Sequence, residues 1–133
     1  MLNKLYKEEA SGLLEFALIL PLLVLMVIGV FDIGRGYTTY ITLGNGAREG
    51  ARWLTTHGKD DNVLDMTRTH ILSEASQVDL INDEITITPS KAIYNAGDEV
   101  TILIDHPYPL LFGAVTGLPT PQMRIEATMT VLY

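Results

Sequence analysis

The stretch EEASGLLEFALILPLLVLMVIG, residues 8–29, decides the fold of this chain. No charge occurs from Phe16 to Phe31, and the apolar character extends outward to Leu13 and Ile33. A helix over that range is about 30 Å long, which is the thickness of a bilayer's hydrocarbon core. A signal peptide has a shorter apolar core of about 7–15 residues and a small-residue cleavage site. No A-x-A site follows here, so the sequence predicts a membrane-spanning helix.

Two basic residues set the expected orientation of this helix. Lys4 and Lys7 precede the apolar stretch, and Lys and Arg mark the cytoplasmic side of a membrane helix. We therefore expect a cytoplasmic N-terminus at insertion, with residues 36–133 on the other side of the membrane.

Two residues within or beside the apolar stretch are unusual there. A carboxylate such as Glu15 is costly in a bilayer unless it meets a partner. Pro21 removes a helical hydrogen bond, so we expect a kink or local unwinding, with neighbouring helices covering the freed carbonyl.

The helix is expected to continue past the membrane. In residues 37–54 the helical period places one broad stripe opposite a polar side. The stripe consists of Tyr37, Tyr40, Leu43, Gly44, Ala47, Ala51 and Leu54. Its small residues, Gly44, Ala47 and Ala51, permit close approach of another backbone. Two interpretations fit: this stripe packs on helices of other copies, or it packs on the chain's own head.

Composition limits the classes of function. The chain has 133 residues, enough for one small domain, and a formal net charge of -7. Residues 1–52 are balanced, and residues 53–133 hold eleven acids and four bases. Such an acidic head repels phosphate backbones, so we expect no nucleic-acid binding. With no cysteine, the chain has neither disulfides nor thiol chemistry.

Residues 57–133 are expected to form a small head. HGKDDN at 57–62 predicts a turn, with Asp61 as a cap for an amphipathic helix over 62–78. The period then changes to two, which predicts three strands, around residues 85–88, 100–105 and 124–133. Their apolar face needs a helical cover, and the outer half of the long helix can supply it.

The predicted architecture is therefore α+β: a long N-terminal helix on a small antiparallel sheet. We divide the chain into a leader-like segment at 1–10, the helix at 11–56 and the head at 57–133. The connection HPYPLLFGAVTGLPTP, residues 106–121, is rich in apolar and turn residues. Its residues Tyr108, Leu110, Leu111 and Phe112 either form an exposed patch for subunit contacts or fold over the chain's own core.

No catalytic motif stands out. His57, His70 and His106 lack metal-ligand spacing, and DDNVLD at 60–65 does not follow the calcium-loop pattern. The sequence predicts no enzyme, no cofactor and no metal.

Two motifs carry a family resemblance. GLLEFALILPLLVLMVIGVFDIGR, residues 12–35, followed by NGAREGAR, residues 45–52, resembles the TadE-like family of the Tad pilus systems. That family pairs an EFALxLPLLL entry with an AREGAR exit. The likeness continues more weakly through PYPLL at 107–111 and MRIEATM at 123–129.

The resemblance implies a pilin-like subunit of the type IV filament superfamily. Its implied partners are copies of itself, the pilus assembly platform of the inner membrane and a prepilin peptidase. Its implied location is the cytoplasmic membrane before assembly and an extracellular filament afterwards. The alternative is a minor pilin, or a monomeric membrane-anchored module that binds another assembly protein.

The resemblance also implies a processing site and a role for Glu15. In this family the glutamate is the fifth residue after the peptidase cut, which places the cut between Ala10 and Ser11. The chain departs from the commonest pattern here, because a glycine usually precedes the cut. Glu15 would then pair with the Ser11 α-amine of a neighbouring subunit, or, in an uncut chain, with Lys4, Lys7 or an arginine of an adjacent chain. Otherwise Glu15 extends its carboxylate to the cytoplasmic interface.

Overall fold

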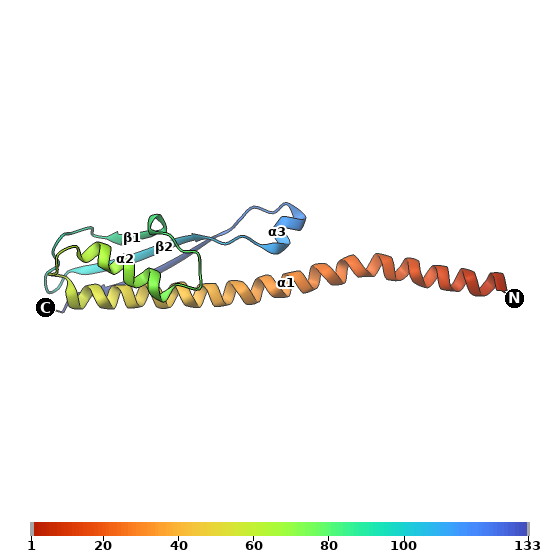
Figure 1. Ribbon diagram of the computed structural model, residues 1–133, viewed down its shortest axis with the longest axis horizontal. Helices are drawn as coiled ribbons and strands as arrows, with labels where there is room; N and C mark the ends of the chain where they lie inside the picture. The colour runs from red at the N-terminus through yellow and green to blue at the C-terminus, as the bar shows by residue number, and fades with distance from the viewer. Residues whose placement is uncertain (1, 133) are drawn as a thin grey trace.

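The computed structural model describes the backbone of residues 2–132 and the side chains of residues 12–132. In chain order the elements are α1 (Leu2–His57), α2 (Val63–Glu74), the 3-10 turn η1 (Asn82–Glu84), β1 (Ile85–Thr88), β2 (Glu99–Pro107), α3 (Leu111–Thr116) and β3 (Gln122–Thr130). Figure 1 shows the head packed along the C-terminal half of α1, while the N-terminal half extends away from it. The predicted α+β class, a long helix on a small antiparallel sheet, is confirmed.

The helix α1 runs for 56 residues without interruption. Pro21 lies inside it, so the local unwinding expected at this proline is absent. The N-terminal half is gently curved (Figure 1), as long helices commonly are, and the helix has no break at Pro21.

The sheet has the order β1-β2-β3, and both pairs are antiparallel. Ile102 of β2 lies opposite Ile87 of β1 and Ala127 of β3, so the inward residues form a row across the sheet. The predicted alternation is confirmed in all three strands, whose apolar side chains are buried on one face. β3 begins at Gln122 and ends at Thr130, slightly earlier than predicted at both ends.

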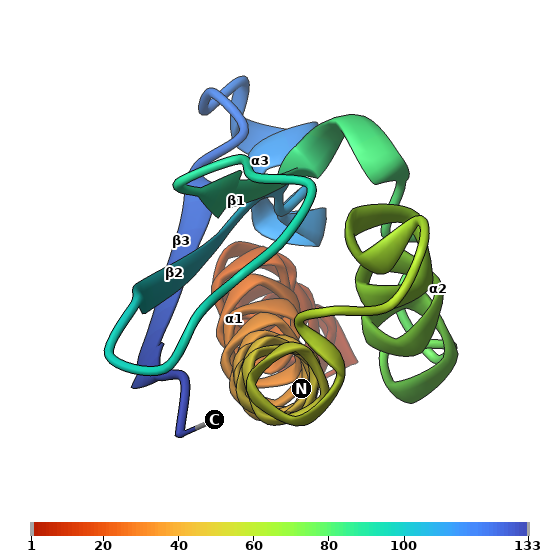
Figure 2. The same cartoon turned by 90° about the vertical axis from the view of Figure 1, so that its left-hand side faces the viewer.

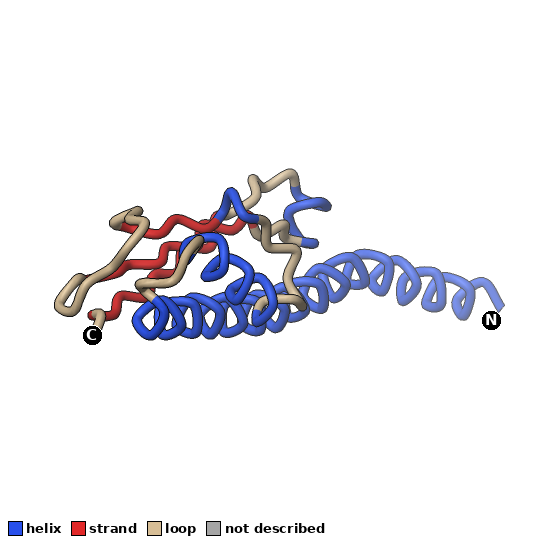
Figure 3. The backbone as a smooth tube through the Cα atoms, turned by 60° about the vertical axis from the view of Figure 1, so that its left-hand side comes forward, coloured by secondary structure: helices blue, strands red, loops and turns tan. Residues whose placement is uncertain are grey.

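The core lies between α1, α2 and the sheet. Figure 2, a view along α1, shows the sheet on one side of this helix and α2 on another. Figure 3 shows the strands running along the helix rather than across it. The largest fully buried side chains come from every layer: Leu43, Leu54, Ile71, Tyr94, Ile102 and Ile104. The outer half of α1 is thus the cover that the sheet was predicted to need.

The start of α2 corrects one prediction. The helix begins at Val63, and its N-cap position is taken by Asn62 rather than by Asp61. Asn62 has φ 60°, a left-handed conformation that asparagine tolerates better than most residues. Its side chain makes no capping hydrogen bond. The turn after α1 therefore extends one residue further, and α2 ends at Glu74, before the predicted Val78.

Two glycines let α2 approach α1 closely. A Cβ atom on Gly50 would lie 2.7 Å from Cδ1 of Ile71, and one on Gly46 would lie 3.3 Å from the carbonyl oxygen of Ile71. The sequence prediction named Gly44, Ala47 and Ala51 as the close-approach residues and did not single out these two. The closest approach between the two helices depends on Gly46 and Gly50.

Candidate functional site: the apolar half of α1 and its junction with the head

Residues 13–33, here called the apolar half of α1, have almost no cover in this chain. Every residue from Gly12 to Val24 is exposed. The exposed large side chains include Leu13, Phe16, Leu18, Leu22, Met26, Val30, Phe31 and Ile33. An apolar surface of this size on all sides of a helix needs lipid or other helices around it. By length and composition α1 contains one segment able to cross a membrane.

The residues predicted for assembly at the N-terminal end lie on this open surface. Glu15, Phe16 and Pro21 are all exposed. Among the side chains of residues 12–132, no ion pair or hydrogen bond involves Glu15. The side chains of Lys4, Lys7, Ala10 and Ser11 lie outside the described residues, so the proposed cut stays a prediction.

The small-residue seam has a different environment. Ala47 and Ala51 are fully buried, and Gly44 is buried as well. Ala47 and Ala51 belong to the same cluster as Ile71 of α2 and Ile102 of the sheet. In this structure they contact the chain's own head, as in the second of the two interpretations of the stripe. Tyr37 and Tyr40, by contrast, are exposed and lie outside that contact.

Asp32 joins the apolar half of α1 to the head. Its side chain is 5% exposed, although it lies next to exposed Phe31 and Ile33. The backbone N–H of Leu111 donates to Asp32 Oδ1 at 2.9 Å, and the N–H of Phe112 donates to Oδ2 at 2.7 Å. Both oxygens of one carboxylate therefore accept the first amides of α3, which a helix start otherwise leaves unpaired.

Tyr108 and Arg35 complete this junction. The Tyr108 hydroxyl donates to the Asp32 carbonyl oxygen at 2.9 Å. Arg35 lies 3.8 Å from Asp32 Oδ1, and its guanidinium is 5.5 Å from the centre of the Tyr108 ring. Burial raises the pKa of the Tyr108 hydroxyl, which keeps this donor protonated. The four groups fix the end of β2 and the start of α3 against α1.

The loop predicted as a possible contact patch is thus divided. Tyr108 is 5% exposed and folds onto α1, whereas Leu111 is 48% exposed. Leu110 and Phe112 are partly buried. Part of the loop follows the own-core interpretation, and part of it stays on the surface.

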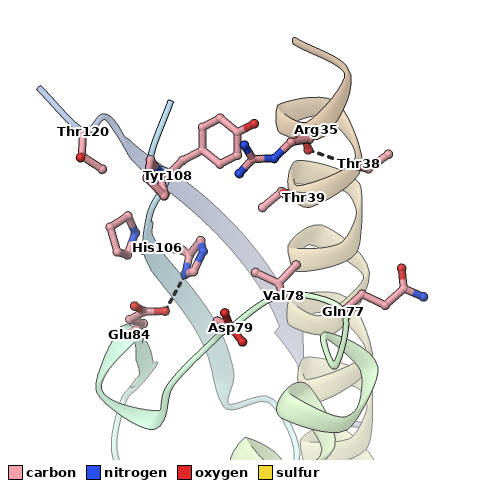
Figure 4. Close-up of a pocket in the computed structure, with 12 residues that line it drawn as sticks. Arg35, Thr38, Thr39, Gln77, Val78, Asp79, Glu84, His106, Tyr108 and Thr120 are labelled. Carbon is pink, nitrogen blue, oxygen red and sulfur yellow. Dashed lines mark hydrogen bonds and ion pairs between the residues drawn. The ribbon is translucent and has the colours of Figure 1, made fainter. Parts of the chain in front are cut away.

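A groove of about 570 Å³ opens beside this junction (Figure 4). Figure 4 shows Arg35 and Thr39 of α1 on one side, with His106 and Tyr108 from the end of β2 on the other. His106 Nδ1 lies 2.7 Å from Glu84 Oε2, and this pair forms part of the groove wall. Within residues 12–132 no group of three His, Cys, Asp or Glu residues could hold a metal ion. The other two histidines, His57 and His70, stack on Trp53.

The sequence analysis missed Asp32 and Arg35, although a signal for them was present. Asp32 is the single charged residue between Glu15 and Arg35. A carboxylate at the end of an apolar stretch needs hydrogen-bond donors, and that requirement could have pointed to a docked partner segment. The identity of that segment, almost 80 residues further on, is not visible in a local pattern.

The family of TadE-like proteins has a model that matches residues 10–52. The match spans the apolar half of α1 and the NGAREGAR motif, and it confirms the resemblance predicted from these residues. No curated protein and no solved structure matches the chain.

Proposed function

We propose that this chain is a pilin-like structural subunit that assembles through α1 into an extracellular filament. Before assembly the apolar half of α1 spans the cytoplasmic membrane, and afterwards it packs among the same segments of other copies. The observation that carries this proposal is that every residue from 12 to 24 is exposed, while the head has a hydrophobic core of its own to which none of them belongs.

The energetics favour such a packed state. Each large apolar side chain contributes about 1.5–3 kcal/mol when it is fully buried. The apolar half of α1 offers more than a dozen exposed side chains of this kind. Outside the membrane, where the alternative is exposure to water, burying half of them in a helix bundle contributes about 10–20 kcal/mol, against an association cost of about 4–15 kcal/mol.

Glu15 supplies specificity in this proposal. It lies near the start of the apolar half, where an unpaired carboxylate would oppose burial. A cation of a neighbouring subunit, the Ser11 α-amine of a cut chain or a basic side chain of an uncut one, pairs with it. This pairing selects one axial offset between neighbouring helices. At any other offset a charge would be buried without a partner.

The test compares Glu15→Leu and Glu15→Gln in cells that produce the filament. Loss of one partner from a buried ion pair costs about 3–5 kcal/mol, so both variants should lose nearly all sheared filaments while staying in the membrane fraction. Glu74→Gln, which changes an exposed carboxylate on α2, is the matched control and should assemble normally. Electron microscopy of sheared material and intact mass give the readout, and the mass also locates the N-terminus.

Normal filaments from both Glu15 variants would contradict the role of this residue in assembly. A wild-type chain that stays entirely in the membrane would instead support the second candidate, a membrane-anchored module or minor pilin. The groove beside Arg35 and His106 favours that candidate, because a binding module needs a concave surface on its head.

A further inference from the structure

One stretch of the head differs in charge from all the rest. Residues 107–123 contain no charged side chain, whereas residues 53–133 together hold eleven acids and four bases. The whole of α3 lies inside this uncharged stretch. A long interval without charge in an acidic head indicates a surface that meets something other than water.

The uncharged stretch lies beside the apolar half of α1. Asp32 holds the first two amides of α3, and in Figure 1 α3 lies beyond the sheet, toward the N-terminus. On α1, Leu25 and Ile28 are partly buried while most of their neighbours are exposed. With Asp32, these residues share one face at helical spacing. The segment around α3 therefore covers part of the apolar half itself.

The other side of α3 is open and apolar. Leu111 and Val115, four residues apart on this helix, are 48% and 64% exposed, and Leu118, just after it, is 52% exposed. On α1, Phe31 and Ile33, which flank Asp32 in the sequence, are exposed as well. The exposed apolar side chains of α3 thus lie near the end of the apolar half, where Asp32 accepts the amides of Leu111 and Phe112.

The backbone of this stretch is suited to an environment poor in water. Four of its residues, at 107, 109, 119 and 121, are prolines, which have no N–H to leave unpaired. The N–H of Tyr108 donates to the Pro121 carbonyl at 2.9 Å, and that of Gly117 donates to the Gly113 carbonyl at 2.7 Å. With the two amides held by Asp32, most donors are removed or satisfied, as lipid contact requires.

We propose that the α3 segment, residues 107–121, is seated in the lipid headgroup region of the leaflet on the head side before the subunit assembles. This inference rests on the membrane insertion of α1 proposed above. An element at the bilayer surface buries its apolar side about 5–10 Å into the boundary between headgroups and acyl chains. Tyr37 and Tyr40, exposed on α1 just above Asp32, lie where interfacial tyrosines concentrate. The position of the α3 segment in the headgroup region fixes how deep the apolar half of α1 lies in the bilayer. It also keeps Asp32 out of the hydrocarbon core.

The experiment uses single-cysteine variants of the full chain, which has no cysteine of its own. Val115→Cys, Leu118→Cys, Leu20→Cys and Leu132→Cys each receive an environment-sensitive fluorophore. Each protein is placed in phosphatidylethanolamine and phosphatidylglycerol vesicles that carry nitroxide quenchers at a shallow or a deep acyl position. Leu132 is the matched control, because it is an exposed leucine, 78% exposed, at the opposite end of the head.

We expect shallow nitroxides to remove most of the fluorescence at positions 115 and 118. Deep nitroxides should quench position 20, and neither should quench position 132. If positions 115 and 118 behave like position 132 while position 20 is quenched, the interfacial seat is overturned and the membrane span stands. If position 20 also escapes quenching, the span fails and the seat fails with it. Labels at 115 and 118 that are shielded from water but not quenched by lipid would assign this surface to a second copy of the chain, against the proposal.

Discussion

The two halves of α1 have opposite relations to the rest of the chain. In the C-terminal half, Leu43, Ala47, Ala51 and Leu54 are fully buried beneath α2 and the sheet. In the N-terminal half, every residue from 12 to 24 is exposed. One continuous helix therefore serves as the central element of a folded head and as an apolar surface that this chain leaves open.

The glycines of α1 show why one half of the helix is buried by the head and the other is not. Gly46 and Gly50 are needed because the backbone and side chain of Ile71 occupy the space where their Cβ atoms would be. Gly12, Gly29 and Gly34 have open space around them. Contacts within the chain explain Gly46 and Gly50, whereas no contact within the described residues explains Gly12, Gly29 and Gly34.

The largest effect that tests this comparison is expected from glycine-to-alanine changes. Gly50→Ala forces Ile71 and Ile102 to move, an overpacking cost of about 1–3 kcal/mol. The better helix propensity of alanine offsets at most about 1 kcal/mol of that cost. The measurement is denaturant unfolding of the full chain in detergent micelles, followed by the fluorescence of Trp53, which stacks on His57 and His70 where α1 meets α2.

Gly29→Ala is the matched control in the apolar half. Its new methyl group meets nothing within 4 Å, so the free energy of unfolding of the head should change by less than about 0.5 kcal/mol. Equal destabilisation by both changes would mean that the apolar half is coupled to the head far more tightly than the contacts described here allow.

A smaller and more local effect is expected at the boundary between the two halves. Asp32→Ala removes the acceptors for the amides of Leu111 and Phe112, and loss of a helix cap costs about 0.5–2 kcal/mol. Hydrogen exchange of residues 108–117 should therefore accelerate by a factor of about 2–30, since 1.4 kcal/mol corresponds to tenfold. The midpoint of head unfolding should hardly move, because the amides released belong to Leu111 and Phe112, which lie outside the hydrophobic core cluster.

Asp32→Asn keeps one side-chain acceptor and should accelerate exchange less than Asp32→Ala. Glu49→Ala removes a different α1 carboxylate, one that pairs with Arg52 on the exposed surface, and should leave residues 108–117 unchanged. Unchanged exchange in Asp32→Ala would show that packing of Tyr108 and Phe112 alone holds α3 in place.

The parts of the fold that the sequence could predict are those with a regular pattern of apolar residues along a single segment. A charge-free stretch, a helical stripe and three alternating strands gave the long helix, its cover of the sheet and the α+β class. The start of α2 was misjudged by one residue, because Asn62 adopts a left-handed conformation that no local pattern distinguishes from a cap at Asp61. Glu15 and the apolar half were found from charge and hydropathy, which act on single segments.

The junction could not be predicted in the same way. It depends on Asp32 meeting residues 108–112, a contact between segments more than 70 positions apart. Likewise, Gly46 and Gly50 are distinguished from Gly44 by the position of Ile71, which follows from the packing of α2 and not from the sequence of α1.

The smallest expected effect is an acid titration at the far end of the head. Asp98 accepts the N–H of Asn95 at 2.8 Å and pairs with Lys91 at 2.9 Å. The hydrogen bond from Asn95, followed by that from Lys91, holds the pKa of this carboxyl below its usual value. Its contribution to stability is therefore complete above the unfolded pKa, about 3.9, and is lost as the pH falls through the lower folded pKa.

An NMR titration of the Asp98 carboxyl carbon and the Asn95 amide should thus show a midpoint below that of an unperturbed aspartate. In Asp98→Asn that step should disappear, because the amide has no proton to gain in this range. Signals from residues 108–117 should not follow the step, since Asp98 belongs to the turn before β2 and α3 lies beyond that strand's other end. If they did follow it, the distal turn and the junction would be coupled through β2, and the two halves of α1 would no longer respond as separate regions.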